Sequence, residues 1–344
     1  MAECRRTALF SALLALYAAV AVPITQAQAA TAIKIGRTNT PTITHLPIYV
    51  ALEAGLFREE GLDASFVVMT QRALVTAGLA GDIDFVPLPR PGAQAALKGA
   101  SVRFVAGQSV FAPTALIAAR GITSLEQLRD RTVGFGELGR SAYEDGEIVL
   151  RDRFGLFADK DYRAIAFPGE KDRFAALAAG DIQAGLFSFP MAARAEANGF
   201  RRLYRTGVFL PRAEGAIWTR AAFLKSGRET VRRFIRAVAR ATDVILTDGD
   251  TAVAVIEKYL DLYRREETKA LWLSVRDTYS ADIPPALLND LFAERLERIR
   301  QKGLWPRNRK APNPEFYIAR SLLRDTLSRL RSAQETIGVT APTR

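Results

Sequence analysis

A turn between residues 136 and 142 has the residue types of an anion-binding site. It follows an apolar run that is predicted to form a strand, and it leads into a predicted helix. A helix N-terminus carries free backbone N–H groups and partial positive charge, which suits a carboxylate, sulfonate or nitrate. Gly139, Arg140 and Ser141 are therefore candidate ligand contacts. In the alternative interpretation, Ser141 only caps the helix, and Glu144 completes a capping box.

Two other polar segments follow predicted strands within the first hundred residues. They contain the candidate contacts Thr40, Thr44, His45, Thr70, Gln71 and Arg72. The Arg72 guanidinium would pair bidentately with a ligand carboxylate, and the alternative is a solvated side chain at the start of a helix. His45 is the only histidine of the chain, either a ligand contact or a solvated loop side chain.

Three larger side chains complete the predicted site. Leu88 lies in the proline-rich segment 87–89, which follows a third predicted strand. Phe111 and Trp218 stand near the two places where the chain is predicted to pass between halves of the molecule. Each aromatic ring would stack on a flat ligand, and the alternative is that each is a core residue.

The residues that most enzymes of comparable size use for catalysis are scarce here. Cys4 is the only cysteine, and one histidine cannot build a zinc site. The chain has no Gly-x-Ser-x-Gly turn, and a single histidine leaves little for acid–base catalysis. We therefore expect a binding protein with no catalytic residue, no metal and no cofactor.

The N-terminus has the pattern of a secretory signal peptide. Arg5 and Arg6 precede an apolar run from Ala8 to Val22, and small residues follow. This run is shorter than the roughly 20 residues that a membrane-spanning helix needs, so we expect cleavage near Ala29 or Ala30. The alternative is that the segment is retained as an anchor. Cleavage would also remove Cys4, so the mature protein would contain no disulfide.

The net charge of +11 has three interpretations: a nucleic-acid partner, an anionic ligand or a solvated surface. Basic residues are dispersed along the chain, with local groups such as 232–240 and 295–300. They indicate solvated helix faces rather than a nucleic-acid site, because no zinc-finger or RNA-recognition pattern accompanies them. We expect no nucleic acid as a partner of this exported chain.

Hydrophobic periodicity predicts an α/β fold in which short strands alternate with helices. After residue 219 the chain becomes almost wholly helical, and the apolar residues between Val231 and Ile245 recur at helical spacing. The predicted strands are 33–36, 63–68, 83–86, 102–106, 115–118, 132–135, 162–166, 185–187, 202–204 and 215–219. The predicted helices between them are 46–54, 72–80, 93–98, 143–154, 173–179 and 191–197.

One structural unit occurs twice. The sequence Leu79–Phe85 is echoed by Ala178–Ala184: an alanine-rich helix, a glycine, an aspartate and an apolar strand. In both copies the glycine suits the left-handed conformation that ends a helix. The chain is also longer than one core usually supports. We therefore expect two similar lobes.

A family resemblance supports the same fold. The stretch Leu46–Asp63, with the segments 80–84, 96–99 and 125–134, resembles the ABC solute-binding proteins for nitrate, sulfonate, taurine and thiamine-pyrimidine precursors. The resemblance covers roughly residues 32–260. Glu137 and Arg140 depart from the smaller, more neutral turn that is usual in this family, which argues against an inorganic or sulfonate anion.

The resemblance implies a two-lobed type II periplasmic binding protein fold, with a mixed, mostly parallel sheet in each lobe and a helical C-terminal extension. Residues 31–112 and 212–330 would form lobe I, 113–211 lobe II, and 331–344 a flexible tail. It implies a periplasmic monomer that binds a small molecule between the lobes and delivers it to an ABC permease and its ATPase, peripheral to the membrane.

Two other classes share this fold. Enzymes of the pyrimidine-precursor synthase or desulfinase type resemble it, but these depend on cysteines, which the mature chain lacks. A sensing domain of a membrane receptor would need a transmembrane helix and an output module.

Overall fold

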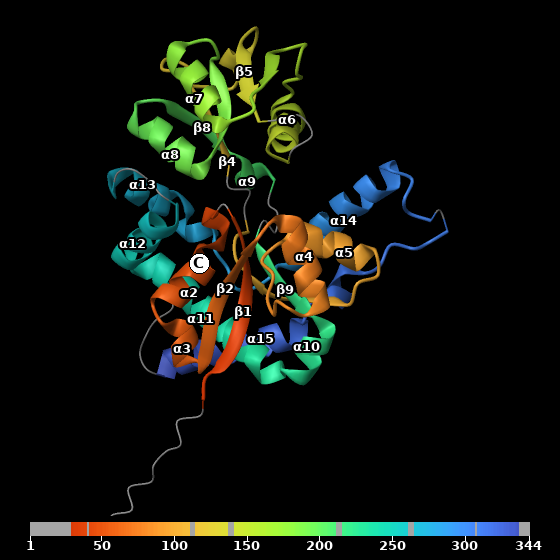
Figure 1. Ribbon diagram of the computed structural model, residues 1–344. Helices are drawn as coiled ribbons and strands as arrows, with labels where there is room; N and C mark the ends of the chain where they lie inside the picture. Colours follow the sequence, from red (N-terminus) through yellow and green to blue (C-terminus); the bar gives the residue numbers. More distant parts are fainter. Residues whose placement is uncertain are drawn as a thin grey trace, which may run out of the picture. The chain divides into compact units, whose positions relative to one another are not determined.

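The computed structural model describes residues 29–39, 41–110, 114–136, 141–210, 215–260, 265–306 and 308–336 (Figure 1). The predicted signal peptide lies almost wholly outside these ranges, and so does most of the predicted C-terminal tail. Both stay predictions. Residues 331–336 of that tail are helical, because Leu327 and Leu330 pack on the core and carry the last helix to Thr336.

The first lobe is built on strands that pair in two sheets. β1 (Thr31–Thr38) runs parallel to β2 (Leu62–Met69), and β3 (Val102–Gly107) runs antiparallel to β9 (Ala216–Arg220). The predicted strand 83–86 joins them with two isolated bridges only. Its backbone pairs with β1 at Gly36 N···Phe85 O, 2.9 Å, and with β9 at Val86 N···Trp218 O, 2.9 Å. The resulting order is β2, β1, residues 85–86, β9 and β3.

Short helices follow these strands along the chain. They are η1 (Ile43–His45), α2 (Leu46–Glu53), α3 (Leu56–Glu59), α4 (Gln71–Ala80) and α5 (Pro89–Leu97). Pro47 and Pro89 stand in the first turns of α2 and α5, where a missing N–H costs no helical hydrogen bond. α5 therefore begins four residues before its predicted start, at Pro89.

The second lobe contains one mixed sheet of five strands. Its order is β6 (Arg163–Ala166), β5 (Thr132–Phe135), β7 (Ala184–Ser188), β4 (Thr114–Ala118) and β8 (Arg201–Arg205). β5 is parallel to β6 and β7, whereas β4 is antiparallel to β7 and β8. The accompanying helices are η2 (Glu126–Leu128), α6 (Ser141–Phe154), α7 (Glu170–Ala179), α8 (Phe189–Ala197) and α9 (Thr206–Phe209).

The two lobes are wound in the same way. In each sheet one strand, β1 or β5, lies between two parallel neighbours, and an antiparallel strand, β9 or β4, pairs with the third of these segments. The predicted repeat is confirmed at its two glycines. Gly81 and Gly180 end α4 and α7 with φ values of 103° and 87°, in the left-handed region.

The C-terminal third is helical, as the periodicity predicts. Its elements are α10 (Ala221–Ser226), α11 (Arg228–Thr247), α12 (Gly249–Leu260), α13 (Arg265–Val275), η3 (Arg276–Thr278), α14 (Pro285–Gln301), η4 (Pro314–Tyr317) and α15 (Arg320–Thr336). α11 packs on α2 and α15, α14 packs on α5, and α13 packs on α12 and α8. The apolar residues that predict α11 are buried, including Val231 and Ile245.

The main apolar core includes side chains of both lobes. It contains residues of β1, β3 and β9, and also Ile117, Leu177 and Phe187 from the second lobe. A smaller cluster lies inside the second lobe. The five strands of the mixed sheet all fall within 113–211, but the boundaries of the two lobes stay predictions.

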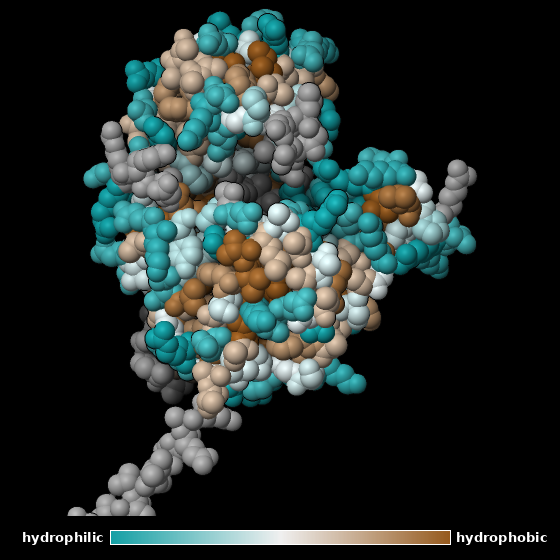
Figure 2. Space-filling model, viewed as in Figure 1, coloured by the Kyte–Doolittle hydropathy of each residue, from teal (hydrophilic) through white to brown (hydrophobic). Residues whose placement is uncertain are grey.

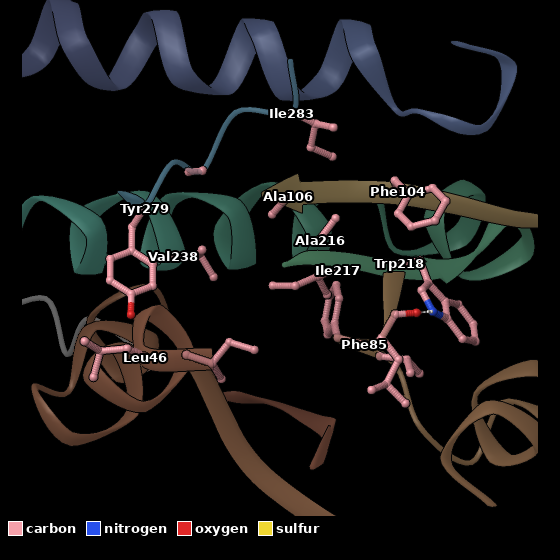
Figure 3. Close-up of a cluster of buried hydrophobic side chains, with 14 of the residues drawn as sticks. Leu46, Phe85, Phe104, Ala106, Ala216, Ile217, Trp218, Val238, Tyr279 and Ile283 are labelled. Atoms are coloured by element: carbon pink, nitrogen blue, oxygen red, sulfur yellow. Dashed lines mark hydrogen bonds between the residues drawn. The ribbon is translucent and has the colours of Figure 1, made fainter. Parts of the chain in front are cut away.

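Figure 3 shows part of the main core, where Trp218 lies close to Phe104 and Phe85. The Trp218 side chain is fully buried, and its indole N–H donates to Leu88 O at 3.1 Å. Gly78 and Gly92 leave the space that the ring fills, since a Cβ at either position would approach it within 3 Å. The expectation that Trp218 stacks on a ligand is therefore corrected, because in this conformation the ring is a core residue.

The surface gives two further observations. Figure 2 shows hydrophobic residues gathered over β1 and β2, where Val68 of the outer strand β2 is 45% exposed. Across the part of the chain that is described, every helix is too short or too polar to cross a membrane.

Candidate functional site

A pocket of about 400 Å³ lies in the first lobe, at the places where its strands end and its helices begin. It is lined by residues from the end of β1, the turn η1, the first residue of α4, the first turn of α5 and helix α14. Its lining residues are Thr38, Thr42, Thr44, His45, Gln71, Pro87, Leu88, Pro89, Arg90, Pro91, Gln94 and Arg295. Open α/β sheets bind ligands at this edge, where helix N-termini add partial positive charge.

Two arginines make the pocket wall cationic. Arg90 comes from the first turn of α5, and Arg295 comes from α14, which packs on α5. Both are largely buried, with side chains 17% and 14% exposed. Arg295 pairs with Glu294, but its Nε is buried without a partner, and burial lowers the pKa of its guanidinium. Such a wall suits an anionic or strongly polar ligand.

His45 faces the pocket in a defined tautomer. Its side chain is buried, and Nε2 lies 2.9 Å from the carbonyl oxygen of Pro87. A carbonyl only accepts, so Nε2 carries the proton and Nδ1 is an acceptor. Nδ1 is buried and has no partner. Burial, and to a smaller degree the charge of Arg37, lowers the pKa of His45 to about 4, so the ring is neutral near pH 7.

The structure brings together four of the predicted contacts. Thr44, His45, Gln71 and Leu88 line the pocket. Thr70 stands next to Gln71, but its hydroxyl is used as the cap of α4, where it accepts from Ala73 N at 3.4 Å.

Other predicted contacts are not in the pocket lining. Arg72 is exposed on α4, consistent with the alternative of a solvated helix start. Ser141 is the first residue of α6, and Glu144 of the expected capping box pairs instead with Arg298. Outside the described residues lie Thr40, Phe111, Gly139 and Arg140, so their roles stay predictions.

Several residues that line the pocket are not predicted from the sequence. Arg295 lies more than two hundred residues away along the chain from the others, and no local pattern marks it. Gln108 is not in the pocket lining, but its side chain is fully buried and both of its amide atoms lack a partner. Its Cβ and the methyl group of Thr44 both lie within 2.8 Å of the position that a Cβ on Gly215 would take. Gln108 follows β3, so the strand-end rule would have found it.

Two ion pairs connect α6 of the second lobe with helices next to the pocket. Arg298 of α14 pairs with Glu144, and Arg90 Nη2 lies 3.9 Å from Asp145 Oδ2. Asp145 is buried as well. The pocket wall is therefore linked electrostatically to the second lobe. Within the described ranges, no group of three or more histidine, cysteine, aspartate or glutamate side chains is arranged to hold a metal ion.

Comparison with known proteins identifies relatives of two functional kinds. The chain is 27% identical to a 4-amino-5-hydroxymethyl-2-methylpyrimidine phosphate synthase of Aspergillus parasiticus over 244 residues, which are 63% of this chain and 67% of the relative. A sulfonate-binding protein SsuA of Methylobacillus flagellatus KT superposes with a TM-score of 0.67 at 15% identity, covering 88% of this chain and 96% of its own.

Two more solved structures have the same fold. The periplasmic nitrate-binding protein NrtA of Synechocystis PCC 6803 has a TM-score of 0.60 at 12% identity, with 87% of this chain and 89% of its own covered. The desulfurization enzyme DSZB has a TM-score of 0.62 at 14% identity, with 88% and 100% covered. The fold is thus the two-lobed type II periplasmic binding protein fold. Residues 42–252 match the family model described as NMT1/THI5 like, so the chain belongs to the NMT1/THI5-like family.

Proposed function

We propose that this chain is the extracytoplasmic solute-binding component of an ABC importer. The observation that carries the proposal is the pocket of about 400 Å³ at the strand ends of the first lobe. This volume lies within the range of roughly 300–1,000 Å³ that small-molecule sites occupy. It is lined by polar and cationic side chains such as Gln71, Arg90 and Arg295, and the sulfonate- and nitrate-binding proteins share the fold.

The ligand that this pocket fits best is a small organic anion or a polar nitrogen heterocycle. Arg90 and Arg295 attract negative charge, and Gln71 supplies both a donor and an acceptor. The neutral His45 adds an acceptor in a place that water reaches poorly. Sulfonate, nitrate, taurine and pyrimidine compounds are the classes to be tried first.

Transport would follow from movement between the two lobes. Ligand binds first to the pocket of the first lobe, and closure then adds contacts from the second lobe. The closed form docks on a permease, whose ATPase drives import. This role places the mature protein in the periplasm as a monomer that meets the membrane only through the permease.

An enzyme of the pyrimidine-precursor synthase or desulfinase type is the second candidate. The relative from Aspergillus parasiticus and the desulfurization enzyme favour it. The single cysteine at position 4 argues against it, because the resemblance implies that these enzymes need cysteines within the folded protein.

A ligand screen separates the two candidates. The mature protein is tested by thermal shift and calorimetry against sulfonates, taurine, nitrate and hydroxymethylpyrimidine compounds, because a bound ligand stabilises the folded state by mass action. We expect one class of compound to bind without being chemically altered. The Gln71→Ala substitution should weaken the affinity for that compound more than tenfold. The control Thr76→Ala lies on the exposed side of α4 and should bind like wild type. Chemical turnover of the ligand, seen by mass spectrometry, would refute the receptor role.

A further inference from the structure

Among the described residues of the second lobe, Arg173 on α7 is a strongly buried cation. Its side chain is 4% exposed. The contacts of its guanidinium are weak: Nη2 reaches Glu170 Oε1 at 3.4 Å, and the Phe187 ring centre lies 5.0 Å from Cζ. Nε is buried without any hydrogen-bond partner. A buried charge normally has strong partners, so this guanidinium has unused capacity to bind.

Glycines of the sheet leave room for the Arg173 side chain. A Cβ on Gly134 of β5 would lie 3.1 Å from Arg173 Cγ, and a Cβ on Gly185 of β7 would lie 3.4 Å from it. The aliphatic part of Arg173 therefore crosses these two neighbouring strands at positions that carry no side chain.

The guanidinium reaches the carboxyl end of β5. Nη1 lies 3.8 Å from the position that a Cβ on Gly136 would take, and no other described atom outside the neighbouring residues lies within 4 Å of that position. Gly136 directly follows β5. The cation thus lies at the carboxyl end of β5, the edge where open α/β sheets bind ligands.

Glu170 does not use all of the hydrogen-bond donors of the Arg173 guanidinium. Its Oε1 accepts from the backbone N–H of Ser188 at 2.5 Å, and its Oε2 accepts from the Ser188 hydroxyl at 2.7 Å. The carboxylate is therefore fixed mainly by the end of β7. Arg173 retains Nη1 and one side of its planar fork for another acceptor.

We propose that Arg173 is the second-lobe contact for an oxyanionic group of the ligand, such as a sulfonate, carboxylate or phosphate. This inference rests on the proposed binding function and assigns part of it to the second lobe. An oxyanion with two or more oxygens matches the planar donors of arginine. Binding there would give the buried charge the strong partner that it lacks.

The test uses Arg173→Met, which keeps the aliphatic stem, and Arg173→Lys, which keeps the charge but not the fork. Arg163→Met is the matched control, since Arg163 is an exposed arginine of the same sheet. Calorimetry measures binding of nitrate, sulfate, phosphate, ethanesulfonate and taurine to each protein. We expect Arg173→Met to weaken the best oxyanion more than tenfold, Arg173→Lys to weaken it less, and the control to match wild type.

A fourth variant separates binding from a purely structural ion pair. Glu170→Gln removes the competing carboxylate while its amide oxygen still accepts from Ser188. We expect it to bind the oxyanion at least as tightly as wild type, even if its melting temperature falls. Loss of oxyanion binding in Glu170→Gln would overturn the proposal. So would a second result: Arg173→Lys binds the oxyanion as tightly as wild type, and Arg173→Met is only less stable than wild type.

The outcome also separates this inference from the proposed function. A neutral ligand that binds wild type and Arg173→Met equally would leave the receptor role intact and refute the role of Arg173. Oxyanion binding that needs Arg173 but not Gln71 would support the role of Arg173 as a ligand contact. It would refute the first-lobe pocket as the binding site. Failure of every oxyanion to bind wild type would refute the assignment of Arg173.

Discussion

At the scale of single residues, burial changes what a side chain can do. His45 was expected on a loop as a ligand contact or a solvated group, but it is buried against Pro87 O and stays neutral. Arg72, by contrast, is the type of residue that binds carboxylates, yet it projects from the exposed side of α4. Residue type alone therefore suggests chemistry, and the surroundings decide whether that chemistry occurs.

The shifted pKa of His45 predicts a pH dependence of stability. The unfolded chain binds a proton at this residue below about pH 6.5, whereas the folded chain does so only below about pH 4. Acid therefore favours the unfolded state, and stability falls between these values as the pH is lowered, by about 3 kcal/mol for the full shift. Urea unfolding should show a smaller loss for His45→Gln across this range. Parallel losses in the two proteins would contradict the burial of His45.

At the scale of elements, apolar periodicity predicts which face of a helix carries the stability. Phe234 of α11 stacks on Phe85 with ring centres 3.7 Å apart and on Phe57 at 5.5 Å. The same helix carries arginines that pair with Glu59 and Glu60 on its outer side. α11 thus joins the helices of the first lobe to its sheet.

Removal of one ring from this stack should lower the free energy of unfolding by a large amount. Phe234→Ala deletes a fully buried side chain, and we expect a loss of about 3–5 kcal/mol in the free energy of unfolding. Thr247→Ala, on the exposed end of the same helix, should change it by less than about 0.5 kcal/mol. Chemical denaturation measures both. Similar values for the two variants would mean that the stack contributes little.

The packing of α5 gives a second prediction at this scale. A Cβ on Gly92 would lie 2.4 Å from Cδ1 of Trp218, and the rigid indole cannot move aside without losing its bond to Leu88 O. Gly92→Ala should therefore destabilise the protein by roughly 1–3 kcal/mol, despite the better helix propensity of alanine. Its thermal midpoint compared with wild type checks this. A more stable variant would show that the core around Trp218 is loose.

At the scale of the whole molecule, charge links the two lobes. Arg298 and Glu144 form a pair between α14 and α6, with both side chains 34% exposed. Partly exposed pairs contribute only about 0.2–1 kcal/mol each, and salt screens them. Such a small energy suits a contact that would break in the proposed opening of the lobes.

Loss of this pair should favour the open form of the ligand-free protein. We expect Arg298→Gln to raise the radius of gyration from X-ray scattering at low ionic strength, and added salt to move wild type in the same direction. Arg300→Gln is the control, because Arg300 is exposed on the same helix. Identical scattering of all three proteins at every salt concentration would exclude a role for the pair in closure.

The sequence alone determined most of the local structure. The predicted strand 132–135 coincides with β5, and the repeated glycines at 81 and 180 end their helices in the left-handed conformation. Such features depend on neighbouring residues, since periodicity and helix termination are local properties. The strand-end rule likewise placed Thr44, His45, Gln71 and Leu88 at one pocket, because parallel strands end at a common edge.

Tertiary structure decided which side chains meet there. Arg295 reaches the pocket only because α14 packs on α5, and Trp218 becomes a core residue only because Gly78 and Gly92 leave room for its ring. Arg173 is buried because two glycines of neighbouring strands align beneath it. These contacts join residues far apart in the chain, and no local pattern encodes a contact whose two partners are brought together only by packing.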